Sequence, residues 1–171
     1  MEDTVTLIAL LIPCLIVAIV FHEVAHGYVA MLLGDPTASE RGRLTLNPIR
    51  HVDPVGTLLV PGALLLAGAP AFGWAKPVPV NQYRLRNPRY GMMAVALAGP
   101  ASNFVLATLG AILIGVLSAI NGASILVEGN VFGTVLTMFL LINIFLGLFN
   151  LLPIPPFDGS HIVGGLLPDR L

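Results

Sequence analysis

The residues best suited to chemistry are two histidines and a glutamate in the run His22-Glu23-Val24-Ala25-His26. On a helix, side chains four positions apart lie on one face, so both imidazoles can bind the same metal ion. Glu23 lies beside them, where a carboxylate can transfer protons during hydrolysis. The alternative is that these polar groups only join neighbouring helices by hydrogen bonds, which requires no such spacing. The pattern therefore favours a metal site with hydrolytic chemistry.

The rest of the chain is too apolar for a soluble domain. Of its 171 residues, 56% are hydrophobic and only 10% are charged, whereas soluble domains carry about 25% charged residues. This composition indicates an integral membrane protein and excludes a soluble enzyme, a disulfide scaffold and a nucleic-acid-binding protein. The single cysteine, Cys14, leaves no internal disulfide and no cysteine-rich metal site.

Four apolar segments must position the histidine motif within the bilayer. Those at about 5–33, 92–120 and 131–152 are long enough to span it as helices. The segment 55–71 is shorter and is interrupted by glycine and proline, so we expect it to enter the membrane without crossing it. The predicted fold is an α-helical polytopic membrane protein with about three spanning helices plus a re-entrant segment.

The positions of the basic residues predict how the protein is oriented in the membrane. Seven of the eight lie in the loops 34–54 and 72–91, and the loop 121–130 has none. The positive-inside rule places both basic loops on the cytoplasmic side, which requires 55–71 to re-enter. The N-terminus then lies outside, and residues 150–158 return to the cytoplasmic half of the membrane, where the first helix ends.

A catalytic zinc ion needs three protein ligands and one open position, so a third ligand is expected. Asp158 is favoured, because it follows the proline-broken stretch 150–157, and bent backbone at membrane depth is tolerated only where it lines a cavity or is buried. Its type and position suit an N-cap of the following helix equally well. His161 is more readily a supporting or surface residue than a ligand, and His51 and Asp53 are more readily solvated.

Six sequence blocks in one order carry a family resemblance. They are FHEVAHG at 21–27, GRLTLNP at 42–48, DPVGT at 53–57, FGWAKPVPVN at 72–81, AGPASN at 98–103 and NLLPIPPFDG at 150–159. This arrangement resembles the site-2 protease family of intramembrane zinc metalloproteases, in the compact prokaryotic form without a PDZ domain. The resemblance extends over most of the chain.

The resemblance implies a site and an activity. It implies Zn²⁺ held by His22, His26 and Asp158, with a broken helix at Asp158-Gly159 and Glu23 as general base and acid. The implied activity is that of a zinc metalloendopeptidase, which cleaves transmembrane segments of membrane-anchored substrate proteins. The enzyme would be a multi-pass protein of the cell membrane, with its active site toward the cytoplasmic half.

Two asparagines are implied to assist catalysis. Asn150 and Asn103 would bind the substrate backbone or stabilise the oxyanion, a role in which an amide donor is effective. The alternative for either residue is a hydrogen bond between helices.

A short membrane-proximal β element is predicted at 43–47. The sequence Arg43-Leu44-Thr45-Leu46-Asn47 alternates with period two and ends at Pro48. Such a strand would either bind an unwound substrate by β-augmentation or only tie the loop down.

Two other functions, a metal transporter and an inert zinc-binding membrane scaffold, are weighed against proteolysis. A transporter should distribute ionisable residues along several spans, but 92–127 and 131–150 contain none. A scaffold would not need Glu23. We expect residues 1–171 to form a single intramembrane metalloprotease core that lacks one or more C-terminal helices usual in the family. Its expected partners are a transmembrane protein substrate and the lipid bilayer, with no nucleic acid; the sequence indicates no oligomeric state.

Overall fold

A computed structural model describes residues 2–68, 74–121, 126 and 130–167. Several sequence features fall partly outside the described residues: the end of the segment 55–71, Phe72 and Gly73, most of the loop 121–130, and the C-terminal residues 168–171.

The described part of the chain forms helices joined by irregular segments, and it contains no β-strand. In chain order the helices are α1 (Glu2–Leu32), α2 (Thr37–Glu40), a 3-10 helix (Pro48–His51), a π-helix (Pro54–Leu59), α3 (Val60–Leu66), a second 3-10 helix (Gln82–Arg84), α4 (Pro88–Asn121), α5 (Val131–Asn150) and α6 (Gly159–Leu166).

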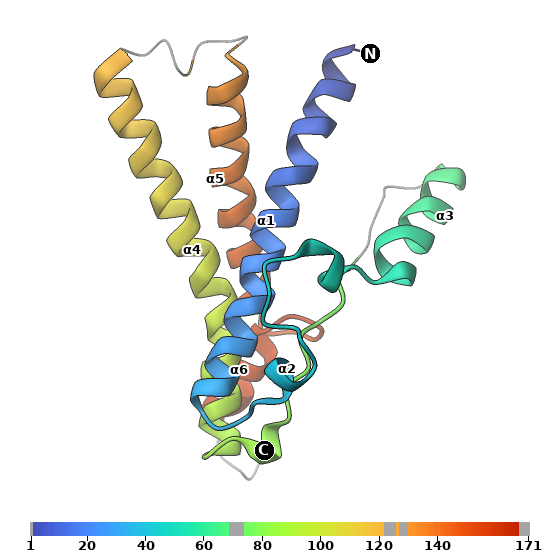
Figure 1. Cartoon of the computed structure of the whole chain (residues 1–171), viewed down its shortest axis with the longest axis vertical. Coiled ribbons are helices and arrows are strands. Elements are labelled where there is room, and N and C mark those ends of the chain that lie inside the picture. Colours follow the sequence, from blue (N-terminus) through green and yellow to red (C-terminus); the bar gives the residue numbers. More distant parts are fainter. Residues whose placement is uncertain (1, 69–73, 122–125, 127–129, 168–171) are drawn as a thin grey trace.

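Three of these helices are long and apolar enough to cross a membrane, which confirms the predicted number of spans. The candidate spans are Val5–Leu32 in α1, Pro88–Ile120 in α4 and Val131–Asn150 in α5. Large apolar side chains stay exposed along all three, as expected for surfaces that face lipid. The helices converge at the end of the bundle that carries α6 and spread apart at the other end (Figure 1).

Local signals set the helix ends. α1 ends at Leu32, and Gly34 two residues later has a φ of 110°, which is strained for residues with a side chain. The Asn87 side chain accepts a hydrogen bond from Tyr90 N at the start of α4, and Asn130 caps α5 by accepting one from Gly133 N. These caps fix where α4 and α5 begin, and hence which of their residues reach the level of the histidine motif.

A buried aspartate ties the end of α1 to the loop that precedes α4. The Asp35 side chain is fully buried, and its carboxylate accepts hydrogen bonds from Thr37 N, from Thr37 Oγ1 and from Asn81 N at 2.6 Å. Burial raises the pKa of Asp35, but these hydrogen bonds and the charge of Arg84 hold the pKa below its usual value. Asp35 therefore anchors the segment 74–81 as a carboxylate.

The stabilisation by Asp35 should disappear in acid. A carboxyl group with a lowered pKa in the folded state stabilises the fold above its unfolded pKa of about 3.9, and this contribution is lost as the pH falls through the folded value. Asp35→Asn should lower the free energy of unfolding at pH 7 by about 1–3 kcal/mol, and the gap from wild type should narrow below about pH 4. Thermal unfolding in detergent at several pH values measures this difference in stability between wild type and Asp35→Asn. A difference that does not change with pH would contradict the proposed role of the charge.

The segment 55–71 is helical where it is described. Asp53 accepts hydrogen bonds from Val55 N and Gly56 N at the start of the π-helix, and α3 follows. α3 lies to one side of the three long helices (Figure 1). Because the structure contains no membrane, the re-entrant placement of this segment stays a prediction.

The predicted strand at 43–47 is not confirmed, because these residues adopt bends and irregular backbone. Two short polar side chains bond to nearby backbone: Thr45 Oγ1 accepts from Asn47 N, and Asn47 Oδ1 accepts from Ile49 N. Such local bonds compete with strand pairing. Period-two alternation alone does not reveal them.

Candidate metal centre

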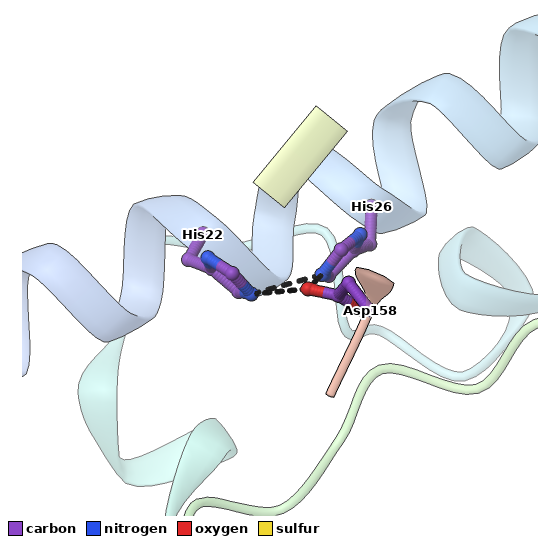
Figure 2. A group of neighbouring side chains, drawn as sticks. All are labelled: His22, His26 and Asp158. Carbon is purple, nitrogen blue, oxygen red and sulfur yellow. Dashed lines mark hydrogen bonds and ion pairs between the residues drawn. The ribbon is translucent and has the colours of Figure 1, made fainter. Parts of the chain in front are cut away.

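The three predicted ligands meet at one point. His22 and His26 project from α1, and Asp158, which directly precedes α6, points its carboxylate between them (Figure 2). The two Nε2 atoms are 3.0 Å apart, and Asp158 Oδ2 lies 3.2 Å from His22 Nε2 and 3.3 Å from His26 Nε2. Donor atoms about 2.0–2.2 Å from a tetrahedral zinc ion are themselves roughly 3.3 Å apart, so these separations suit zinc.

The hydrogen bonds on the far side of each imidazole determine its tautomer. His22 Nδ1 lies 2.6 Å from Asn103 Oδ1, and His26 Nδ1 lies 2.7 Å from the carbonyl oxygen of Val95. Both partners are acceptors, so each Nδ1 must carry the hydrogen and donate it. Each neutral imidazole then presents a lone pair at Nε2, the form that binds a metal.

When both imidazoles are neutral, three acceptor atoms face one another. Asp158 Oδ2 is buried and receives no hydrogen bond from the described residues, and the Asp158 side chain makes no capping bond to α6. An oxygen and two lone pairs at such separations repel one another unless a metal ion or a proton lies between them. The donor set thus fits Zn²⁺, and the geometry does not support the N-cap alternative for Asp158.

Gly159 allows the chain to bring Asp158 to the histidines. After α5 ends, the chain turns back so closely that a Cβ at position 159 would overlap the carbonyl oxygens of Leu151 and Leu152. Backbone atoms cannot yield as flexible side chains do, so only glycine fits here. The Asp158-Gly159 pair thus combines a candidate ligand with the turn that places it.

A second glycine lets α4 approach the imidazoles. A Cβ at Gly99 would lie 2.6 Å from Cε1 of His22 and would overlap the His26 ring at Nε2. The absence of a side chain at position 99 therefore leaves room for both rings in their metal-binding orientation. The block AGPASN at 98–103 contains this glycine, but its contact with the two imidazoles is seen only in the structure.

Glu23 is held by the extended segment 74–80. Its Oε2 accepts a hydrogen bond of 2.7 Å from Val78 N. Gly27, one helical turn further along α1, allows this approach, because a Cβ there would lie 2.9 Å from Val78 Cγ1 and 2.7 Å from Leu44 Cδ2. The carboxylate beside the metal ligands is thereby oriented through one of its two oxygens.

A cavity of about 340 Å³ opens onto these groups. Its walls include the three ligands, Glu23, and Pro77, Val78 and Val80 of the extended segment, as well as Asn150 and His161. Asn150 also donates from Nδ2 to Leu146 O at 2.9 Å. Asn150 therefore lines the same cavity as the three converging side chains.

Asn103 lies outside this cavity. It is fully buried, does not line the cavity, and uses its amide toward His22 Nδ1, Ala18 O and Asn143 Oδ1. The structure therefore places Asn103 behind a ligand, and not where it would meet a substrate carbonyl. Asn143 was missed by the sequence reasoning, although a lone amide within an apolar span is a signal that could have indicated it.

Comparisons with known proteins agree with this chemistry. Residues 113–170, which include Asp158 but not the histidine motif, match the family model described as "Peptidase family M50". "Putative zinc metalloprotease YwhC" of Bacillus subtilis is 42% identical over 163 residues, covering 95% of this chain and 71% of the relative. "Putative zinc metalloprotease Rip2" of Mycolicibacterium smegmatis is 31% identical over 145 residues, covering 84% of this chain and 52% of the relative. No solved structure matches the chain.

Proposed function

The chain belongs to peptidase family M50, the site-2 protease family, and on that premise we propose that it is a zinc-dependent intramembrane endopeptidase. It would cleave transmembrane segments of membrane-anchored proteins. The observation that carries the proposal is the convergence of His22 Nε2, His26 Nε2 and Asp158 Oδ2 beside Glu23, in a protein with three helices apolar enough to span a membrane.

Each residue at the site would have a distinct role. His22, His26 and Asp158 would hold the zinc ion, which when bound acts as a Lewis acid that polarises the scissile carbonyl and makes water nucleophilic at neutral pH. Val78 N–H fixes one oxygen of Glu23, so the other oxygen would accept the proton of the attacking water and return it to the leaving amine. Asn150 would donate from the cavity wall to the developing oxyanion, since only one of its two amide hydrogens is needed for Leu146 O.

The substrate would have to be extended at the site, because a helix shields its peptide bonds. The segment 74–80 lines the cavity and bonds to the protein along one edge: Lys76 N donates to His51 O at 2.9 Å, and Val78 N donates to Glu23. Alternate residues of extended backbone face opposite edges, so Pro77 and Pro79 face the other edge, where they offer carbonyl acceptors and no N–H. We propose this edge, in place of 43–47, as the surface for strand addition by the substrate.

Contacts between the two basic loops support a cytoplasmic site. Arg84 Nη1 lies 2.8 Å from Glu40 Oε2, and Asn81 N donates to Asp35, so the loops before and after 55–71 meet at one end of α1. That arrangement favours a segment 55–71 that re-enters. By the positive-inside rule this end, with the metal site near it, would face the cytoplasm of the cell.

The test is cleavage in a bilayer. The full chain in proteoliposomes with a model single-span substrate should cleave it, a zinc chelator should abolish the activity, and added Zn²⁺ should restore it. Mass spectrometry of the products should map the cut within the apolar segment. Cleavage that resists chelation would contradict the metal mechanism, and a cut only in the soluble flank would contradict the intramembrane assignment.

A further inference from the structure

We propose that Asn103, supported by Asn143, is a positioning residue that holds the His22 imidazole in the tautomer and orientation required to bind zinc. The proposal rests on the proposed function, because it concerns a ligand of the proposed zinc site. It assigns to Asn103 a role different from oxyanion stabilisation, and it assigns one to Asn143 for the first time.

A continuous chain of hydrogen bonds carries the proposal. His22 Nδ1 lies 2.6 Å from Asn103 Oδ1, Asn103 Nδ2 donates to Asn143 Oδ1 at 2.9 Å, and Asn143 Nδ2 donates to Phe139 O at 2.8 Å. These side chains come from α1, α4 and α5, and both asparagines are fully buried. This series of hydrogen bonds therefore links one proposed metal ligand to all three long helices.

The direction of every bond in this chain is fixed. Phe139 O can only accept, so the amide nitrogen of Asn143 faces it and its oxygen faces Asn103. The Asn103 nitrogen then donates both its hydrogens, one to Asn143 Oδ1 and the other to Ala18 O at 3.1 Å. Only the Asn103 oxygen is left for His22, which must present a hydrogen at Nδ1, so that its neutral form carries the lone pair at Nε2.

A comparison with His26 shows why the orientation of His22 depends on the side chains of Asn103 and Asn143. The support of His26 Nδ1 is a backbone carbonyl, Val95 O, which the α4 helix already fixes. The support of His22 Nδ1 is a side-chain amide whose two ends would be interchangeable without Asn143 and Ala18 O. Asn143 thus acts through Asn103, by preventing the amide rotation that would turn a donor toward His22.

The competing explanation is that the two asparagines only hold helices together. Helix association by a polar network would make Asn143→Ala less stable but would leave zinc affinity unchanged. If the asparagines position His22, the loss of zinc affinity should instead exceed any loss of stability of the metal-free protein. Metal affinity and metal-free stability therefore distinguish the two roles without any protease assay.

The experiment measures zinc affinity by competition with a chromogenic chelator, and ligand geometry from the visible spectrum of the Co²⁺ form, in detergent. Asn103→Ala should weaken zinc binding about 10- to 100-fold and change the Co²⁺ spectrum. Asn143→Ala should weaken it less. The double variant should bind as Asn103→Ala does, because Asn143 acts only through Asn103. Cys14→Ala is the matched control, since it removes another side-chain contact between α1 and α5, to Val135 O, and should leave affinity unchanged.

Two results would overturn the proposal: unchanged zinc affinity in Asn103→Ala, or losses that add in the double variant. If Asn103→Ala does not fold, Asn143→Ala carries the test, because it leaves Asn103 in place; unchanged zinc affinity there overturns the proposal too. Failure of the proposed function would look different: wild type would bind zinc with the expected sensitivity to these substitutions, yet cleave no membrane substrate.

Discussion

Glu23→Gln should abolish cleavage of a transmembrane substrate while the protein keeps its zinc. The glutamine side chain has nearly the same shape, and its amide oxygen can still accept the hydrogen bond from Val78 N. The amide cannot accept and return a proton, however. General acid–base groups contribute about 10²- to 10⁴-fold to rates, so kcat should fall by at least about a hundredfold.

Retention of the metal is what makes this substitution informative. The three converging atoms belong to His22, His26 and Asp158, so Glu23→Gln removes no proposed ligand. Initial rates on a single-span substrate in proteoliposomes, together with metal analysis of the same sample, measure both quantities. Glu40→Gln is the matched control, because the Glu40 side chain is exposed and pairs with Arg84, so this substitution should leave the rate unchanged. Wild-type rates in Glu23→Gln would exclude Glu23 as the proton-transfer group.

The parts of this molecule that depend on local periodicity could be predicted from the sequence. A helix places residues four positions apart on one face whatever surrounds it, so the pairing of His22 with His26 follows from their spacing. Apolar runs long enough to cross a bilayer gave the three candidate spans, and the structure confirms their number. The approach of Asp158 to the histidines could be inferred only from the order of the segments and the positive-inside rule. A role for Asp158 as a metal ligand was predicted as one of two alternatives, the other being a helix N-cap.

The parts that depend on contacts between distant segments could not be predicted. Asn143 is an amide within an apolar stretch of α5, and nothing in its neighbours indicates that it faces Asn103, forty positions earlier. Likewise, a strand at 43–47 required a partner that alternation does not specify. The segment 74–80 contains two prolines and forms neither helix nor strand, yet it supplies the backbone amide that orients Glu23.

Gly99→Ala should prevent stable zinc binding although it adds a single methyl group. The added Cβ would lie 2.6 Å from His22 Cε1 and would overlap the His26 ring. Contacts this short force something to move, and the backbone of α4 is fixed there by its own helix and by the hydrogen bond that Val95 O accepts from His26 Nδ1. The imidazoles would have to rotate away from Asp158, and displaced ligands should weaken zinc affinity by at least about a hundredfold.

Gly115→Ala separates this steric effect from the general effect of alanine in a helix. Gly115 lies in the same helix, and a Cβ there would meet no atom within 4 Å. Alanine favours a helix over glycine by about 1 kcal/mol, so both variants gain helix propensity, but only Gly99→Ala gains the clash. Zinc affinity by chelator competition should fall in Gly99→Ala alone, and the protease rate should fall with it. Because both rings abut the same Cβ position, wild-type zinc affinity in Gly99→Ala would mean that α4 does not approach the two histidines as the structure places it.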